Sequence, residues 1–404
     1  MTEQTGPLDG VRVVELGNFI AAPTAGRLLA DFGADVVKVE RPGTGDELRR
    51  WRLHGGDTSL LFRTLGRNKR SVTVDLRRAE GQEIVRALAA RSDVLLENFR
   101  PGTLERWGLG PDELRALNPR LVVVRVSGYG QTGPYRDRPG FGGVAEAIGG
   151  LRALTGYPDR PPTRVGVSLA DSVAGLYAVI GALMGLIRRD REPGATPGEV
   201  VDVALYEAVY SLMESLIPDF DAFGVTRGPA GSALPGVAPS NTYRCADGKY
   251  IVVSGNGDAI FTRLMRAIGR ADLADDPRFA DNAGRVAHAE LLDDAIEAWT
   301  TSLSQEAAEA VLRGASVPCG PILTAADITK DPHFAARGMH ERHRVRIGGR
   351  EAEVTFPGIV PALAERPGRT RTLGPDLGEH TETVLAELGV TGAAVERLRE
   401  SGVI

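Results

Sequence analysis

Short runs of apolar and β-branched residues alternate with amphipathic segments through the first half of the chain. The short runs predict strands at residues 11–16, 35–40, 71–76, 94–97, 121–127 and 200–205. The intervening segments predict helices at residues 24–32, 80–91, 112–117 and 206–216. This alternation is typical of an α/β fold in which helices cover a parallel sheet, and such sheets bind ligands at the carboxyl ends of their strands.

The composition changes after residue 223. Residues 224–239 are rich in Gly, Pro, Ala and Ser, which predicts a linker or a mobile loop. A hairpin at residues 241–254 and helices within residues 261–313 predict a smaller α+β domain beyond it. A second hairpin, with strands at 344–347 and 352–356, and a helix from Thr381 follow. We therefore divide the chain into a large domain at 1–220, a small domain with its linker at 221–330, and a C-terminal part at 331–404 that returns to the large domain.

The longest apolar run covers residues 173–187 and is shorter than the roughly 20 residues that span a bilayer. We predict a buried core helix there, and no membrane partner.

Charge and composition narrow the classes of function. The 404-residue chain has a formal net charge of −5 with interspersed signs, so we expect no nucleic-acid partner. Its N-terminus lacks a basic start followed by an apolar run, and we expect a cytoplasmic protein. Cys245 and Cys319 are too few for a thiolate metal site, and the histidines are scattered, so no metal site is expected. The first strand is not followed by GxGxxG, and no GxxxxGK[ST] loop is present, which disfavours a nicotinamide enzyme or a nucleotide hydrolase.

Asp171 lies at the start of the apolar helix. Unpaired backbone N–H groups at a helix N-terminus favour an ionised carboxylate, which could attack a carbonyl carbon while the same groups stabilise the oxyanion. Ser168 followed by Asp171 is equally typical of a capping box, and on local grounds capping is the commoner role. Both roles stay open at this point.

Several longer blocks, in the same order along the chain, resemble the family III CoA-transferases, the CaiB/BaiF group that includes formyl-CoA and carnitine CoA-transferases. The blocks are GPLDGVRVVEL from Gly6, AGRLLADFGADVVKVERPGTGD from Ala25, GRNKRSVTVDL from Gly66, ENFRPG from Glu97, LNPRLVVVRVSGYGQTGP from Leu117, RPGFGGVAEAIGG from Arg138 and GVSLADSVAGLYA from Gly166. A further phrase, NTYRCADGKYIVV near Asn241, extends the resemblance into the small domain.

The resemblance implies a large Rossmann-like domain, a smaller α+β domain and an interlocked homodimer. It also implies that Asp171 is the nucleophile, that CoA is a cosubstrate and not a permanently bound cofactor, and that the partners are an acyl-CoA and a carboxylic acid acceptor. CoA contacts are implied after the first four strands and at a glycine-rich turn, at Ile20, Ala21, Arg41, Val74, Arg77, Asn98, Phe99, Arg100, Arg106, Gly140, Phe141 and Gly142. Guanidinium groups suit the phosphates and adenine of CoA, although each arginine could equally be a solvated surface residue.

Two departures limit the resemblance. Formyl-CoA transferase has glutamine at the position of Ile20, and its glycine run over the active site is replaced here by the looser segment 228–240, so an oxalate-type acceptor is not supported.

An acyl-CoA racemase of the same superfamily is the nearest alternative. It needs an acid/base pair, and the expected histidine position is occupied by Phe141. A non-catalytic CoA-binding paralogue is the second alternative.

Overall fold

The structure is a computed structural model that describes residues 6–54, 58–191 and 197–404. The first five residues, on which the expectation of no secretory leader partly rests, lie outside the described part. The chain forms two compact units, each described separately below. Unit 1 comprises residues 1–151, 165–214 and 333–404, and unit 2 comprises residues 152–164 and 215–332.

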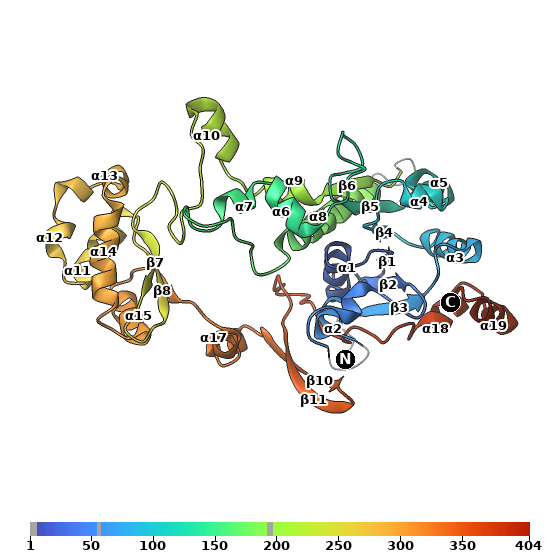
Figure 1. The fold of residues 1–404 in the computed structure, drawn as a ribbon. Helices are drawn as coiled ribbons and strands as arrows, with labels where there is room; N and C mark the ends of the chain where they lie inside the picture. The colour runs from blue at the N-terminus through green and yellow to red at the C-terminus, as the bar shows by residue number, and fades with distance from the viewer. Residues whose placement is uncertain (1–5, 55–57, 192–196) are drawn as a thin grey trace. The chain divides into compact units, whose positions relative to one another are not determined.

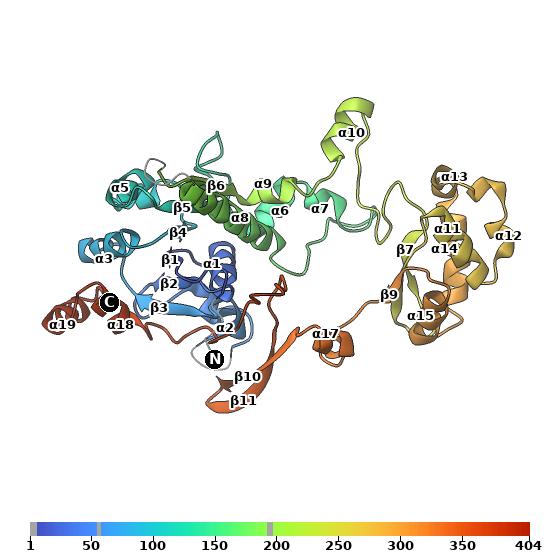
Figure 2. The same ribbon diagram turned by 180° about the vertical axis from the view of Figure 1, so that it is seen from behind.

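Unit 1 contains a six-stranded, fully parallel sheet in the order β3-β2-β1-β4-β5-β6 (Figures 1 and 2). The strands are β1 (Arg12–Glu15), β2 (Asp35–Glu40), β3 (Lys69–Thr73), β4 (Val94–Glu97), β5 (Val122–Ser127) and β6 (Val200–Ala204). The α/β prediction and its parallel sheet are confirmed. Because the strand order reverses between β1 and β4, the topological switch point lies there.

Helices cover both faces of this sheet. Those of unit 1 are α1 (Ala21–Asp31), α2 (Leu60–Leu65), α3 (Ala79–Ala89), α4 (Thr103–Arg106), α5 (Pro111–Leu117), α6 (Gly142–Ile148), α8 (Leu169–Arg191), α9 (Leu205–Tyr210), α18 (Thr381–Glu387) and α19 (Ala393–Glu400), with the short 3₁₀ helix η1 (Glu47–Arg50). Residues of α3, α5, α18 and α19 share one apolar core with β1–β5. Helices α1 and α8 pack against each other. Of these two, α1 contacts β1, β2 and β4, and α8 contacts β5 and β6. The helix predicted at 206–216 is too long, because α9 ends at Tyr210.

The C-terminal part of unit 1 also contains the antiparallel hairpin β10 (His340–Ile347) and β11 (Arg350–Pro357), which extends the predicted hairpin at both ends. Two short helices, α7 (Leu151–Leu154) and α17 (Pro332–Ala336), lie at the boundaries between the units.

Unit 2 has a core of its own, built by a three-stranded sheet and the helices around it. Its elements are α10 (Leu216–Phe223), β7 (Ser240–Arg244), β8 (Tyr250–Ser254), α11 (Asp258–Ala267), α12 (Ala271–Ala274), η2 (Pro277–Phe279), α13 (Asn282–Ala287), α14 (Ala289–Thr300), α15 (Gln305–Gly314), β9 (Cys319–Pro321) and α16 (Ala325–Ile328). The predicted hairpin is the antiparallel pair β7–β8. Strand β9, which pairs with β8, was not predicted, because its three residues include a glycine and a proline.

Helix α8 differs from the predicted buried core helix, because only one of its faces is buried. The buried face consists mainly of small residues such as Ala174, Ala178 and Ala182, and the exposed face carries Ile180 and Met184. By length and composition alone this helix could cross a membrane, but the core helices of soluble proteins pass the same test. Its packing against α1, α9, β5 and β6 is that of a helix covering a sheet.

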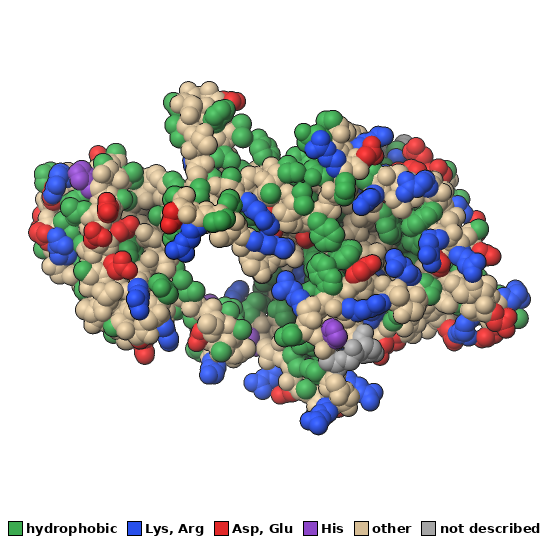
Figure 3. All heavy atoms as spheres, in the orientation of Figure 1, with side chains coloured by type: hydrophobic (Ala, Val, Ile, Leu, Met, Phe, Trp, Pro, Cys, Tyr) green, Lys and Arg blue, Asp and Glu red, His purple; other side chains and the backbone are tan. Residues whose placement is uncertain are grey.

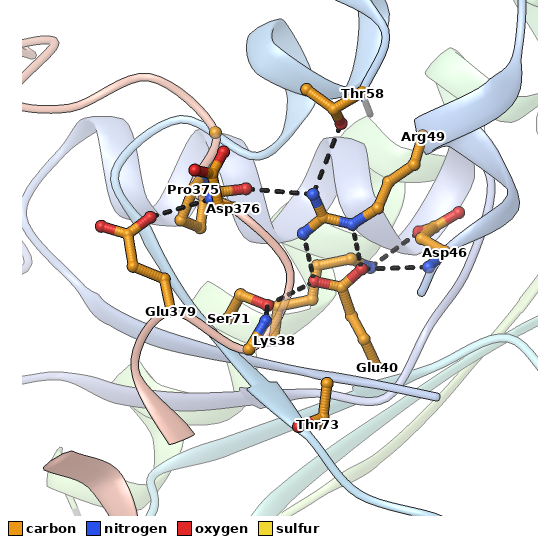
Figure 4. Close-up of polar contacts among 12 residues, drawn as sticks. Lys38, Glu40, Asp46, Arg49, Thr58, Ser71, Thr73, Pro375, Asp376 and Glu379 are labelled. Atoms are coloured by element: carbon orange, nitrogen blue, oxygen red, sulfur yellow. Dashed lines mark hydrogen bonds and ion pairs between the residues drawn. The ribbon is translucent and has the colours of Figure 1, made fainter. Parts of the chain in front are cut away.

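A buried cluster of charged side chains lies on one face of the sheet, where Lys69 Nζ reaches the carbonyl oxygen of Pro23 in α1. Figure 4 shows Lys38, Glu40, Asp46 and Arg49 of this cluster. Its acids are Glu15, Glu40 and Asp46, and its bases are Lys38, Arg49 and Lys69, each at most 4% exposed. Alternation along each strand explains the arrangement, because Val37 and Val39 face the apolar core while Lys38 and Glu40 point to the opposite face of the sheet. Acids and bases are equal in number, so each buried charge has an opposite partner, which a buried ion requires.

Candidate active site

The loops after β1 and β4 meet at the switch point. Asn98, directly after β4, accepts a hydrogen bond on Oδ1 from the backbone N–H of Asn18 at 2.9 Å. Its Nδ2 donates to the carbonyl oxygen of Asn18 at 2.7 Å. One amide side chain therefore satisfies both backbone groups of Asn18 and joins the two halves of the sheet at their carboxyl edge.

A cleft opens at this edge beside the loops after β1, β2, β3 and β4. It is lined by Leu16, Asn18, Val39, Glu40, Arg41, Gly45, Val74, Asp75, Leu76, Arg77, Phe99 and Trp107. Four of the expected CoA contacts, Arg41, Val74, Arg77 and Phe99, are therefore brought together although they come from three different loops. Phe99 and Trp107 pack edge to face with ring centroids 5.4 Å apart, which gives this cleft an aromatic side.

The four arginines in the expected CoA contacts differ in their surroundings. Arg77 forms a bidentate pair with Asp75, at 2.9 Å from Nε to Oδ1 and 2.8 Å from Nη2 to Oδ2, and this contact lowers the pKa of Asp75. In the described part of the chain, the exposed Arg41 side chain has no hydrogen bond or ion pair. Arg100 and Arg106 are exposed and do not line the cleft, and Arg106 donates to Thr103 Oγ1 at 3.0 Å. Arg41 is thus the guanidinium most readily available to a phosphate.

Asp171 lies in the first turn of α8 and is half-buried. Its carboxylate packs directly on Gly142, the first residue of α6: a Cβ placed at Gly142 would lie 2.0 Å from Oδ2 and 3.3 Å from Oδ1. Real Cβ atoms do not approach an oxygen this closely, so the carboxylate occupies space that only glycine leaves open. Gly140 makes a similar approach to Gly128 after β5, where a Cβ would lie 2.7 Å from the Gly128 Cα.

The N-terminal turn of α1 lies beside the same region. A Cβ at Gly175, one turn after Asp171, would lie 2.8 Å from the carbonyl oxygen of Ala21. Ala21 opens α1, and the buried Ile20 is its N-cap residue. The structure therefore places Gly142 and the start of α1 near Asp171, whereas the buried Ile20 side chain belongs to an apolar cluster with Leu48, Phe62 and Leu65.

Three aromatic rings connect the loop after β1 with the turn before α6. The ring centroid of Phe19 lies 5.3 Å from that of Phe141 and 5.2 Å from that of Trp51. Phe141 is 52% exposed, so the ring next to Gly142 lies at the surface of unit 1.

Burial shifts the pKa of two groups in the sheet, Glu97 at its carboxyl edge and Lys69 at the start of β3. Glu97, the last residue of β4, has its pKa raised to about 7 by burial, although Arg125 Nε lies 2.7 Å from its Oε1 and lowers the pKa. Burial also lowers the pKa of Lys69 to about 8, against the effect of Glu15 at 2.6 Å.

Some site residues were not singled out from the sequence. Asn18 and Trp107 line the cleft. Asn18 lies at the carboxyl end of the first predicted strand, where such sheets bind ligands, but it was not assigned a contact with CoA. Trp107 follows the short helix α4, and no local pattern marks it. In the described ranges, no group of three or more His, Cys, Asp or Glu side chains could hold a metal ion.

Comparison with known proteins identifies the class of protein to which this fold and site belong. A sequence model described as CoA-transferase family III matches residues 8–381, and the chain belongs to this family. The resemblance seen in the sequence is thereby confirmed.

Individual relatives are similar over their full length. The chain is 48% identical over 404 residues to succinyl-CoA–D-citramalate CoA-transferase from Chloroflexus aurantiacus, with 98% of each chain covered. It is 43% identical to the succinyl-CoA–L-malate CoA-transferase beta subunit of that organism, covering 100% of this chain and 99% of the relative. A crystal structure of a CaiB/BaiF family protein from Brucella suis has a TM-score of 0.82 and 37% identity, covering 95% of this chain and 100% of that one. The protein is thus an acyl-CoA:carboxylate CoA-transferase with CoA as cosubstrate.

Proposed function

We propose that the protein transfers CoA reversibly between an acyl-CoA and a free carboxylic acid through a covalent intermediate on Asp171. The observation that carries this proposal is the position of the Asp171 carboxylate, in the first turn of the 23-residue helix α8 and against the bare Cα of Gly142. The α8 N-terminus favours the ionised carboxylate, and Gly142 lets the carboxylate take a position that any side chain there would block.

The exchange proceeds by four acyl transfers that balance without ATP or metal. Asp171 attacks the thioester carbonyl, which forms a mixed anhydride and releases CoA thiolate. The thiolate attacks the aspartyl carbonyl, which gives aspartyl-CoA thioester and the free donor acid. The acceptor carboxylate then attacks this thioester to form a second anhydride and thiolate, and the thiolate attacks the acceptor carbonyl, which restores Asp171. Covalent catalysis divides one difficult exchange into easier steps and conserves the thioester energy.

The cleft at the carboxyl edge is proposed to hold CoA. Arg41 is placed to bind phosphate oxygens, while Phe99 offers a ring face for adenine. Arg77 is available to phosphate only if the ligand replaces Asp75, so we expect it to contribute less than Arg41.

We propose succinyl-CoA as the donor and a short 2-hydroxy dicarboxylate as the acceptor. The support is similarity alone: relatives at 48% and 43% identity over essentially the whole chain are named for succinyl-CoA with D-citramalate and L-malate. Exchange assays with succinyl-CoA against a panel of mono- and dicarboxylic acids test this assignment. Transfer confined to monocarboxylates would contradict it, and transfer to water alone would indicate a thioesterase.

Intact-mass measurement tests the intermediate. Incubation with succinyl-CoA is expected to add CoA to the wild-type protein by a thioester bond, and Asp171→Ala is expected to abolish both the adduct and exchange. Asp190→Ala is the matched control, because Asp190 lies at the other end of α8, where it pairs with Arg120 and Arg189. Exchange of the α-proton without an adduct would indicate a racemase, and neither reaction would indicate a CoA-binding paralogue.

We also propose that the protein acts as a homodimer. The exposed face of α8 carries Leu176, Ile180, Met184 and Ile187, and hydrophobic side chains gather on the surface where Figure 1 shows α6, α8 and α9 (Figure 3). A contiguous apolar face of this kind is typical of an interface. That the two chains interlock, and that the protein is cytoplasmic, remain predictions.

A further inference from the structure

The loop after β1 adopts an unusual backbone conformation at Phe19. Its φ is +62°, in the left-handed region that a bulky side chain rarely adopts. In this conformation the ring packs between Trp51 and Phe141. Because such a conformation persists only where the surroundings enforce it, the contacts that hold Phe19 need to be identified.

Side chains from three other segments hold the backbone of this loop. Lys38 Nζ donates to the carbonyl oxygen of Gly17 at 2.8 Å. Asn98 binds both backbone groups of Asn18. Asp46 Oδ1 accepts from the N–H of Phe19 at 3.1 Å and from the N–H of Leu48 at 2.9 Å.

Asp46 connects this loop to the buried charged cluster. Its Oδ2 lies 2.8 Å from Lys38 Nζ, and its own N–H donates to Glu40 Oε2 at 3.0 Å (Figure 4). Lys38 in turn contacts Glu15 at 2.9 Å. The Asp46 carboxylate is therefore fixed on both oxygens, on one by a buried cation and on the other by two backbone donors.

We propose that Asp46 is a positioning residue for CoA transfer: by holding the N–H of Phe19, it keeps the Phe19 ring against Phe141 and thereby sets the position of Gly142 under the Asp171 carboxylate. Phe141 and Gly142 are consecutive, so a shift of the Phe141 ring moves the backbone on which Asp171 packs. Asp46 is fully buried, so this role needs no contact with the substrate.

Holding a loop in this way requires a carboxylate of this length. An asparagine has a single acceptor oxygen, which can serve either Lys38 or the N–H of Phe19 but not both, and its NH2 group would oppose the other donor. A glutamate keeps the charge, but its longer side chain moves the carboxylate away from the N–H. Each variant therefore removes one half of the connection.

The proposal rests on the covalent intermediate on Asp171, and single-turnover kinetics test the two separately. The rate of adduct formation from succinyl-CoA is expected to fall about tenfold to a hundredfold in Asp46→Asn, in Asp46→Glu and in Phe19→Ala, since small misplacements of reacting groups have effects of this size. Because Asp46 acts through Phe19, the double variant Asp46→Asn/Phe19→Ala is expected to be no slower than the slower single variant.

Asp31→Asn is the matched control. Asp31 is a buried carboxylate at the far end of α1, where it binds Arg67 and Asn68 and makes no contact with the 17–20 loop. This variant is expected to lower the melting temperature but to leave the rate of adduct formation at the wild-type level, and its effects should combine multiplicatively with those of Phe19→Ala.

Full multiplicativity of Asp46→Asn with Phe19→Ala, or wild-type rates in both folded Asp46 variants, would overturn the positioning role. Asp46→Glu keeps the ion pair and supplies the test if Asp46→Asn does not fold. Absence of an adduct in the wild-type protein would instead contradict the proposed function.

Discussion

At the scale of single residues, the contact between Asp171 and Gly142 explains how two distant parts of the chain form one site. The sequence places them 29 positions apart, and the structure puts the carboxylate on the bare Cα of the glycine. A helix-capping role and a nucleophilic role make different demands on this contact, since only the nucleophile needs open space in front of its oxygens.

Gly142→Ala tests this demand. The added methyl would lie 2.0 Å from Oδ2, so the Asp171 side chain must turn away. We expect the rate of exchange to fall about a hundredfold, with an overpacking cost in stability of about 1–3 kcal/mol. Steady-state exchange assays and urea unfolding measure the two effects. Gly166→Ala is the control, because open space surrounds that glycine, and near-wild-type exchange in Gly142→Ala would contradict the assigned contact.

The sequence could predict part of this site but not all of it. Asp171 was predicted from its position at a helix start, and Gly142 and Arg41 were implied by the family resemblance. The engagement of Arg77 by Asp75 could not be foreseen, because nothing in the sequence distinguishes a paired surface arginine from an available one. Asp46 was not singled out either, since its role depends on contacts with Phe19 and Lys38 that only the fold creates.

At the scale of secondary-structure elements, the close packing of α1 and α8 depends on small residues. Gly175 faces the carbonyl oxygen of Ala21 and the side chain of Thr24, at 2.8 Å and 2.9 Å from a Cβ placed there. This crossing sets the first turn of α8, and with it Asp171, beside the start of α1.

Gly175→Ala is expected to destabilise unit 1 although alanine favours helices. Intrinsic propensity would stabilise by up to about 1 kcal/mol, but the clash with backbone is expected to cost about 1–3 kcal/mol. Urea unfolding is expected to show a net loss. The control is Gly314→Ala in α15, where nothing lies within 4 Å and a neutral or stabilising effect is expected. A stabilising effect of Gly175→Ala would mean that α1 and α8 can move apart without cost, and it would contradict the assigned contact.

The elements of the parallel sheet could be predicted because each strand is a short apolar run between helices; β2 and β4 have the predicted bounds. The start of β3 was missed because Lys69 and Arg70 are charged, and Lys69 is buried only through its ion pair with Glu15. The burial of α8 was overestimated, since its apolar residues surround the helix and periodicity cannot show which face lacks a neighbour.

At the scale of the whole molecule, the proposed homodimer makes a prediction about the exposed face of α8. Ile180→Asp/Met184→Asp introduces charges on the exposed α8 face, where Met184 is 66% exposed. We expect the double variant to shift from dimer to monomer in light scattering at micromolar concentration, because buried, unpaired charges are strongly unfavourable at an interface.

Leu117→Asp is the control for that experiment. Leu117 is also exposed, at 52%, but lies at the end of α5. It is expected to leave the dimer intact. A wild-type protein that is a strict monomer, or a double variant that stays dimeric, would contradict the assignment of this face.

The side chain of Asn98 has a consequence for how any ligand enters. In open α/β sheets the crevice between the two central loops normally receives the ligand. Here the two hydrogen bonds between Asn98 and Asn18 close the floor of that crevice with the protein's own atoms. A ligand in the cleft therefore lies against the joined loops after β1 and β4, on the side that the loops after β2 and β3 also line.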